Sequence, residues 1–297
     1  MFSRVDHLVI AVPDLTAAIE RYTALGFHIF DAGSNEDAGT RSAVVFYDDQ
    51  YLELLAIEDA ATQRDAAARD ASCDPGLAAF IQAGGGIRAI ALATDDLAGE
   101  VAAIRARGVQ VSDPTRQART TPTGARIEWL ASVPLGEGAL PLLFVQHLSD
   151  LDARRAQAPQ RAPHPNGVLD IERIYVAGTS LEEMVAAYSG VLGGPPPTPQ
   201  DGIIIKANMA RYAFAQSDVV AAEAYGPGPT QDAMTARGPG PFQAIHRSSD
   251  VTASARWLEA HDLAPAATGR RANGELVLLV GPEHAFGYNL GFVGRDD

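Results

Sequence analysis

A helix pattern with one spacing recurs four times along this chain, and such a repeat limits the folds that the chain can adopt. In the first copy, Asp14 is placed to cap a helix whose apolar side chains are spaced four and then three residues apart. Gly26 follows where that helix is expected to end. The four copies open at Leu15, Leu97, Leu181 and Val251. The repeat predicts four copies of one structural module.

Strand-like segments flank each of these helices in the same order. The segments that precede the helices are 5–12, 87–93, 171–177 and 242–247. The segments that follow them are 41–47 and 51–57, 126–131 and 142–148, 203–206 and 211–215, and 275–280 and 286–292. This order indicates an α+β fold built from four βαβββ modules, and the Ala-rich connector 59–86 is expected to contain a helix.

The four modules are expected to form two domains, because a chain of 297 residues exceeds the usual size of a single domain. A polar, proline-punctuated segment between the second and third modules is typical of a linker. We therefore predict a first domain over residues 1–150, a linker over 151–167 and a second domain over 168–297.

The charge and hydropathy of the chain narrow its class of partner. A net charge of −14 disfavours binding to nucleic acid and to anionic membranes. No apolar run is long enough for a membrane-spanning helix, and the N-terminus enters a strand pattern directly, without the order of a secretory signal. We expect a cytoplasmic protein with a small-molecule partner, and a homodimer is compatible with the sequence.

The first module resembles the opening module of the vicinal-oxygen-chelate superfamily, a resemblance that extends over nearly the whole chain. The segments that carry it are Asp6-His7-Leu8-Val9-Ile10-Ala11-Val12-Pro13-Asp14-Leu15, then Tyr22 and Leu25-Gly26-Phe27, then Tyr51-Leu52-Glu53-Leu54-Leu55. The superfamily includes glyoxalase I, methylmalonyl-CoA epimerase, extradiol dioxygenases, and fosfomycin- and bleomycin-resistance proteins. The resemblance implies paired modules that form glyoxalase/bleomycin-resistance-like domains with cup-shaped mixed sheets, each able to hold a divalent metal on its first and last strands.

The repeat shows which residue each module offers at the first ligand position. His7 lies eight residues before its helix anchor, and the same offset selects Ala89, Arg173 and Gln243 in the other modules. The last strands offer Glu53 and Gln146 in the first two modules, whereas Ala213 or its neighbours and Asn289 are poor ligands. The resemblance therefore implies a site of His7, Glu53 and Gln146 for Mn, Fe, Co, Ni, Zn or Mg.

Further candidates are expected to face the same cup. Tyr51 lies two residues from Glu53 and shares its strand face, so both are candidate catalytic residues. His147 would reach the metal only if a bulge shifts its strand. The candidate substrate-binding residues are Arg41, Tyr47, Arg88, Arg119, Trp129 and His147.

Three functions are compatible with these residues. The first is a metal-dependent lyase or isomerase that acts on a small oxygenated metabolite by chelation and proton transfer. The second is a metal-free binding or resistance protein that holds a small molecule in the same cup. An extradiol-type dioxygenase ranks third, because the resemblance places its metal in the second module pair, where the ligand positions carry Arg173 and Gln243.

Overall fold

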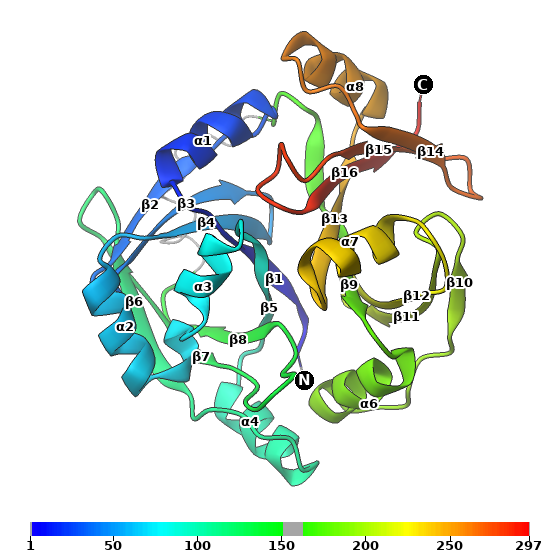
Figure 1. Cartoon of the computed structure of the whole chain (residues 1–297). Helices are drawn as coiled ribbons and strands as arrows, with labels where there is room; N and C mark the ends of the chain where they lie inside the picture. Colours follow the sequence, from blue (N-terminus) through cyan, green and yellow to red (C-terminus); the bar gives the residue numbers. More distant parts are fainter. Residues whose placement is uncertain (1, 151–162, 297) are drawn as a thin grey trace.

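The computed structural model of the chain describes residues 2–150 and 163–296, so most of the expected linker, 151–162, lies outside the described residues. Its first half is a closed eight-stranded barrel (Figure 1). In spatial order the barrel strands are β1 (Arg4–Ala11), β4 (Tyr51–Ile57), β3 (Thr40–Phe46), β2 (Phe30–Asn35), β6 (Thr115–Thr120), β7 (Arg126–Ser132), β8 (Leu142–His147) and β5 (Gly86–Ala93).

The second half is an eight-stranded sheet that does not close, called here the open sheet. Its strands in spatial order are β10 (Gln200–Gly202), β11 (Ala207–Ala213), β12 (Asp218–Ala224), β9 (Val168–Gly178), β13 (Gly240–Ser248), β16 (Asn289–Gly294), β15 (Leu276–Val280) and β14 (Ala267–Arg270). Two curled sheets in an α+β chain are the fold that the sequence predicted.

The fourfold repeat is confirmed by the topology. In every module the first strand pairs in parallel with the last, and the remaining two follow in antiparallel order. The module helices are α1 (Leu15–Ala24), α4 (Leu97–Ala106), α6 (Leu181–Leu192) and α8 (Val251–Ala260), so all four begin at the predicted anchors. Asp14, Asp96 and Asp250 each accept a hydrogen bond from a first-turn backbone amide, as the capping pattern required.

The connectors contain further helices. The connector between the first two modules forms α2 (Ala60–Arg69), the short 3-10 helix η1 (Ala71–Cys73) and α3 (Leu77–Gln82), which confirms the expected helix. The sequence did not predict α7 (Pro229–Arg237), which packs on β9, β12 and β13 of the open sheet (Figure 1).

The strands expected in the third module were partly wrong. Residues 203–206 form the turn between β10 and β11, with Ile203 67% exposed, and β11 begins at Ala207 rather than at Arg211. The last strand of the module is β12, which was not expected, and Val220 lies opposite Tyr175 of β9 in its register. The ligand position that was expected near Ala213 of β11 therefore lies on β12 instead, at Val220.

The barrel closes at a single backbone bridge between β2 and β6. Ser34 pairs there with Thr120, and the neighbouring Gly33 has a φ of +87°. A Cβ placed on Gly33 would lie 1.9 Å from the carbonyl oxygen of Thr120. Because the clash is with backbone, only displacement of one strand would relieve it.

Gly33→Ala is expected to lower the free energy of unfolding by about 3 kcal/mol, which combines left-handed backbone strain with overpacking at the closure. Gly108→Ala is the matched control, because Gly108 has a φ of +85° but open space around its Cβ. The control should cost about 1 kcal/mol in urea unfolding. Equal losses in the two variants would contradict a tight closure at Gly33.

Alternation along the barrel strands separates a covered outer face from a hollow interior. On β4, Leu52, Leu54 and Ala56 are buried beneath helices, whereas Glu53 and Leu55 are only half-buried and line an internal cavity. A strand with apolar residues on its outer face and partly exposed residues on its inner face is typical of a barrel that encloses a ligand.

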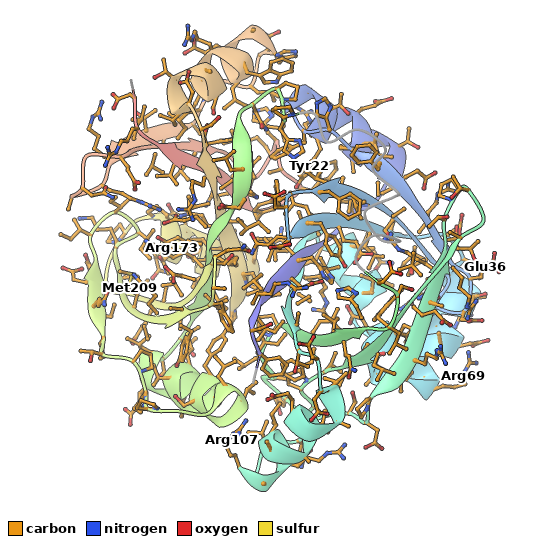
Figure 2. All side chains as sticks on the ribbon, turned by 180° about the vertical axis from the view of Figure 1, so that it is seen from behind. Tyr22, Glu36, Arg69, Arg107, Arg173 and Met209 are labelled. Carbon is orange, nitrogen blue, oxygen red and sulfur yellow. The ribbon has the colours of Figure 1, made fainter. Side chains whose placement is uncertain are left out.

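The two halves pack against each other through a shared hydrophobic core. The hydroxyl oxygens of Tyr22 and Tyr288 lie 2.8 Å apart across this interface, and Figure 2 places Tyr22 at the junction of the halves. Gln50 of the first half donates to the Ser217 hydroxyl of the second at 2.6 Å. Among the described residues, no helix is long and apolar enough to cross a membrane.

Candidate functional site

The first candidate ligand, His7, lies at the narrow end of the barrel with one ring nitrogen fixed. Its Nδ1 lies 2.9 Å from Oδ2 of Asp6, and since a carboxylate only accepts, Nδ1 carries the proton. The Nε2 atom of the same ring lies 3.7 Å from Oε2 of Glu53. The ring stacks on Tyr51 with centroids 4.3 Å apart. The ring of His7 is therefore fixed between Asp6 at Nδ1 and Glu53 at Nε2.

Asp6, which the sequence analysis did not select, organises this end of the barrel. Its side chain is buried and accepts from Arg4 at 2.8 Å, His7 at 2.9 Å and Nε2 of His147 at 3.0 Å. Burial alone would raise the pKa of Asp6, but the hydrogen bonds from His147 and His7 outweigh it and hold the pKa well below its usual value. Asp6 is thus a fixed negative charge behind two histidines.

A β-bulge explains how neighbouring residues reach the same site. Adjacent residues on a regular strand point to opposite faces, so Asp6 and His7 should not meet. The register of β1 against β5 shifts between Val5 and His7, and Asp6 is the extra residue at that shift. The only sequence signal was the juxtaposition of an acid and a histidine, which does not reveal a bulge.

Glu53 lies where two cavities meet. A small cavity of about 70 Å³ surrounds His7, Tyr51 and His147, and a large cavity of about 870 Å³ extends from there toward the second half. Glu53, Arg119, Trp129 and Leu143 line both cavities. A molecule in the large cavity therefore meets Glu53 before it meets His7.

Three of the predicted substrate-binding residues line this site: Arg119, Trp129 and His147. Arg119 and Trp129 project from β6 and β7 into the barrel, and Arg119 donates to the carbonyl of Ala32 at 3.3 Å. Arg88 lines only the large cavity, where Asp74 holds its guanidinium through two hydrogen bonds of 2.6 and 2.7 Å. Arg88 is thus neutralised, whereas Arg119 forms no ion pair with a carboxylate of the described residues.

Three candidates lie elsewhere. Gln146 faces outward, where its Oε1 accepts from the backbone amide of Leu97 at 2.9 Å, so it caps α4 rather than joining His7 and Glu53. Arg41 is on the outer face of β3 and pairs with Asp31 at 2.5 Å. Tyr47 is buried between the two halves, where burial raises the pKa of its phenol. These three expectations require correction.

The strand register identifies the true counterparts of His7 and Glu53 in the second module. Val9 of β1 lies opposite Glu53 of β4, and the equivalent pair on β5 and β8 is Ala91 and Leu143. The counterpart of His7 is Ala89 by its offset from the helix anchor. Half of the four ligand positions are therefore apolar, and no group of three His, Cys, Asp or Glu able to hold a metal occurs among residues 2–150 and 163–296. The donor set does not fit a resident divalent metal.

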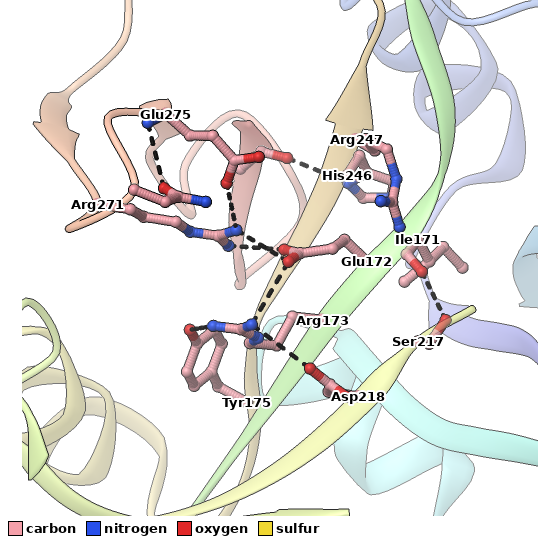
Figure 3. A network of polar contacts seen from close by, with 12 residues as sticks. Ile171, Glu172, Arg173, Tyr175, Ser217, Asp218, His246, Arg247, Arg271 and Glu275 are labelled. Carbon is pink, nitrogen blue, oxygen red and sulfur yellow. Dashed lines mark hydrogen bonds and ion pairs between the residues drawn. The ribbon is translucent and has the colours of Figure 1, made fainter. Parts of the chain in front are cut away.

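The open sheet offers no substitute site. Val220 and Gly291 stand at the positions equivalent to Glu53, and an apolar cluster that includes Tyr175 and Phe242 fills the corresponding face. Arg173, the counterpart of His7, is held between Glu172 and Asp218, each at 3.4 Å (Figure 3). Among the described residues of this half, apolar side chains occupy the face that forms the ligand cup in the barrel, so the ligand positions give no support for an extradiol-type centre there.

Solved structures of similar shape cover nearly the whole chain. A hypothetical protein from Staphylococcus aureus matches with 13% identity and a TM-score of 0.67, over 98% of this chain and 99% of its own. A mutant 4-hydroxymandelate synthase from Streptomyces coelicolor matches with 15% identity and a TM-score of 0.66, over 100% and 93%. The Mn(II)-bound glyoxalase from Novosphingobium aromaticivorans matches with 17% identity and a TM-score of 0.58, over 98% and 82%. At these identities the likeness shows the fold.

The sequence comparisons identify the family. A search of curated proteins finds no match. The family model described as a glyoxalase-like domain matches residues 5–192, which include the whole barrel and the start of the second half. Together with the repeated βαβββ topology, this match shows that the chain belongs to the glyoxalase-like domain family.

Proposed function

We propose that the chain binds a small oxygenated molecule in the hollow barrel and moves a proton on it, as an isomerase or lyase. The observation that supports this most directly is the line of Asp6, His7 and Glu53 where the two cavities meet. Proton transfer requires a base that contacts the ligand. A second acceptor behind that base, oriented by a buried acid, can take the proton onward.

Glu53 is the group that a bound molecule would meet. As a carboxylate it would take a proton from the carbon next to a carbonyl group, which leaves negative charge on the carbonyl oxygen as an enolate forms. Arg119 lines the same cavity and is positioned to stabilise that charge. In this arrangement Glu53 is the base and Arg119 supplies the positive charge.

His7 would serve as the next acceptor. Once protonated, Glu53 would face Nε2 of His7, which can accept a proton when the ring is neutral, and the charge of the imidazolium formed would be balanced by Asp6. Return of the proton to a different face or carbon of the enolate completes an isomerisation. Loss of a neighbouring leaving group from the enolate completes an elimination.

A divalent metal is what the family resemblance implied, and His7 and Glu53 are the two ligands that the barrel would offer it. With Ala89 and Leu143 at the other two positions, the described residues supply half of a ligand set. The proposed chemistry therefore relies on Arg119 rather than on a metal.

Deuterium exchange tests the proposal. We expect the wild type to catalyse exchange of the α-hydrogens of at least one member of a panel of 2-oxo and 3-oxo carboxylic acids in D₂O, followed by proton NMR. Glu53→Gln should slow that exchange at least about hundredfold, because the amide cannot accept the proton. Glu128→Gln is the control, since Glu128 lies on the outer face of β7 and pairs with Arg116.

Exchange that persists in Glu53→Gln would exclude Glu53 as the base. If panel members bind without any exchange in the wild type, the enzyme proposal fails and a metal-free binding protein remains. The observation that favours this second function is the size of the cavity, about 870 Å³, which is in the upper range of small-molecule pockets.

A further inference from the structure

The lining of the large cavity changes character between its two ends. Its inner end, which adjoins the small cavity, carries Glu53 and Arg119. The part lined by both halves of the chain, called here the mouth, carries mainly apolar side chains. The apolar residues that line the mouth include Leu77, Phe80, Leu140, Val176 and Met184. A ligand that fills this space would need a polar head and an apolar body.

Two of the polar side chains that line this part of the cavity, Arg88 and Gln117, are already partnered within the protein. Arg88 is bound by Asp74 through two hydrogen bonds, and Gln117 donates to Asp70 at 2.9 Å and to Ser72 at 3.1 Å. Groups satisfied in this way offer little to a ligand, so the apolar side chains determine what fits there. The mouth favours a hydrocarbon or aromatic segment.

The inner end of the cavity has the opposite requirement. Arg119 is half-buried, and its guanidinium has no carboxylate partner among the described residues. A cation withdrawn from water without a counter-charge is costly, and a planar guanidinium matches a carboxylate well. A carboxylate head next to Arg119 would supply the missing partner, and in a 2-oxo acid the adjacent carbonyl oxygen would face other donors of the same guanidinium.

The second half contributes one wall of the cavity. Residues 176–180 at the end of β9, Met184 and Ala187 of α6, and residues 239–241 at the start of β13 all line it. Apolar side chains fill the cup face of the open sheet, yet this half closes the side of the barrel cavity that the body of a ligand would contact. The length of that body is therefore limited by α6.

We propose that the natural ligand is an amphipathic carboxylic acid, with its carboxylate at Arg119 and its apolar body extending along the barrel to the wall formed by α6. This inference rests on the proposed function for the site itself, but it concerns the class of molecule that binds there and not the reaction. It makes the second half of the chain a specificity element.

The test uses fluorescence of Trp129 in a Trp257→Phe background, because the chain has two tryptophans and Trp257 lies on α8 away from the cavity. The probes are straight-chain carboxylates from four to twelve carbons and the matching alkanols. Each added methylene should tighten the Kd about fourfold until the cavity is full. The acids should bind at least about tenfold more tightly than the alkanols.

Two variants locate the ends of the ligand. Arg119→Gln should bring the acids to the level of the alkanols while the dependence on chain length remains. Ala187→Phe should weaken the long acids at least about tenfold and leave butanoate unchanged, because the new ring fills the far end of the cavity. Ala186→Phe, one residue away on the exposed face of α6, should bind like the parent protein.

Binding that does not depend on chain length, equal binding of acids and alkanols, or long acids unaffected by Ala187→Phe would each overturn the inference. Glu53→Gln separates the two proposals, because it should retain the dependence on chain length while it loses exchange. Binding with that dependence but without exchange in the wild type leaves the ligand class intact and rejects the enzyme. Exchange in the wild type without a dependence on chain length would support the enzyme and reject the proposed ligand class.

Discussion

Asp6→Ala is expected to lower the free energy of unfolding by about 3 to 4 kcal/mol, the typical loss when one partner of a buried charged network is removed. The carboxylate accepts three hydrogen bonds, and without it Arg4, His7 and His147 face an apolar gap. Urea unfolding at pH 7 measures this loss. Asp113→Ala removes an exposed carboxylate that pairs with Arg105 and should change stability by less than about 1 kcal/mol.

The pH dependence of this loss has a definite sign. The pKa of Asp6 is held below its usual value of 3.8, so its contribution is present above that pH and disappears as the pH falls through the lower, folded-state pKa. The wild type and Asp6→Ala should therefore converge only in strong acid. Convergence already at pH 5 would mean that Asp6 does not hold a charge in this network.

Asp6→Asn separates stability from chemistry. The amide keeps the shape of the side chain, but it no longer requires Nδ1 of His7 to carry the proton, so Nε2 loses its fixed role as acceptor. We expect slower α-hydrogen exchange and an altered pH profile. A variant that exchanges like the wild type at every pH would show that Asp6 acts on the fold alone.

The repeat could be predicted because its signals are local. A capping Asp at 14, 96 or 250 fixes where a helix begins whatever the rest of the chain does, and the structure confirms each. The strands of the third module lack such a signal. Ile203 and Ile204 read as an apolar strand but are exposed in a turn, since nothing local distinguishes the two.

The site was predicted less well because it depends on strand parity and register. A shift of one residue moves every side chain to the other face, and this is what separates Gln146, which faces α4, from His147, which lines the cavity. Arg41 was likewise expected to face the cavity, but its neighbour Ser42 is the residue that lines it. His7 and Glu53 were correctly expected to lie close together, since both belong to the same module.

Two buried histidines between the halves carry the second large effect. His246 is fully buried among the rings of Phe27, Tyr47 and Phe292, and its Nδ1 donates to the carbonyl of Gly291 at 3.3 Å. Burial lowers the pKa of His246 to about 4. Burial likewise lowers the pKa of His164 to about 4, where its ring bonds to the backbone of the barrel. Both are neutral in the folded protein at pH 7.

As the pH falls, protonation of these two histidines should therefore weaken the interface between the halves before Asp6 becomes protonated. A histidine with a folded-state pKa below its unfolded value of about 6.5 stabilises the fold above that pH, and the stabilisation is lost as the pH falls toward 4. Protonation of each histidine should lower the free energy of unfolding by about 3 kcal/mol between pH 7 and pH 4.

In His246→Leu, urea unfolding across this range should show about half of the wild-type loss, because one of the two protonation sites is gone. His261→Gln, on the exposed end of α8, is the control position. Wild-type and His246→Leu curves that stay parallel from pH 7 to pH 4 would rule out His246 as a source of the acid sensitivity, and the interface would then have to be weakened by His164 or by carboxylates elsewhere.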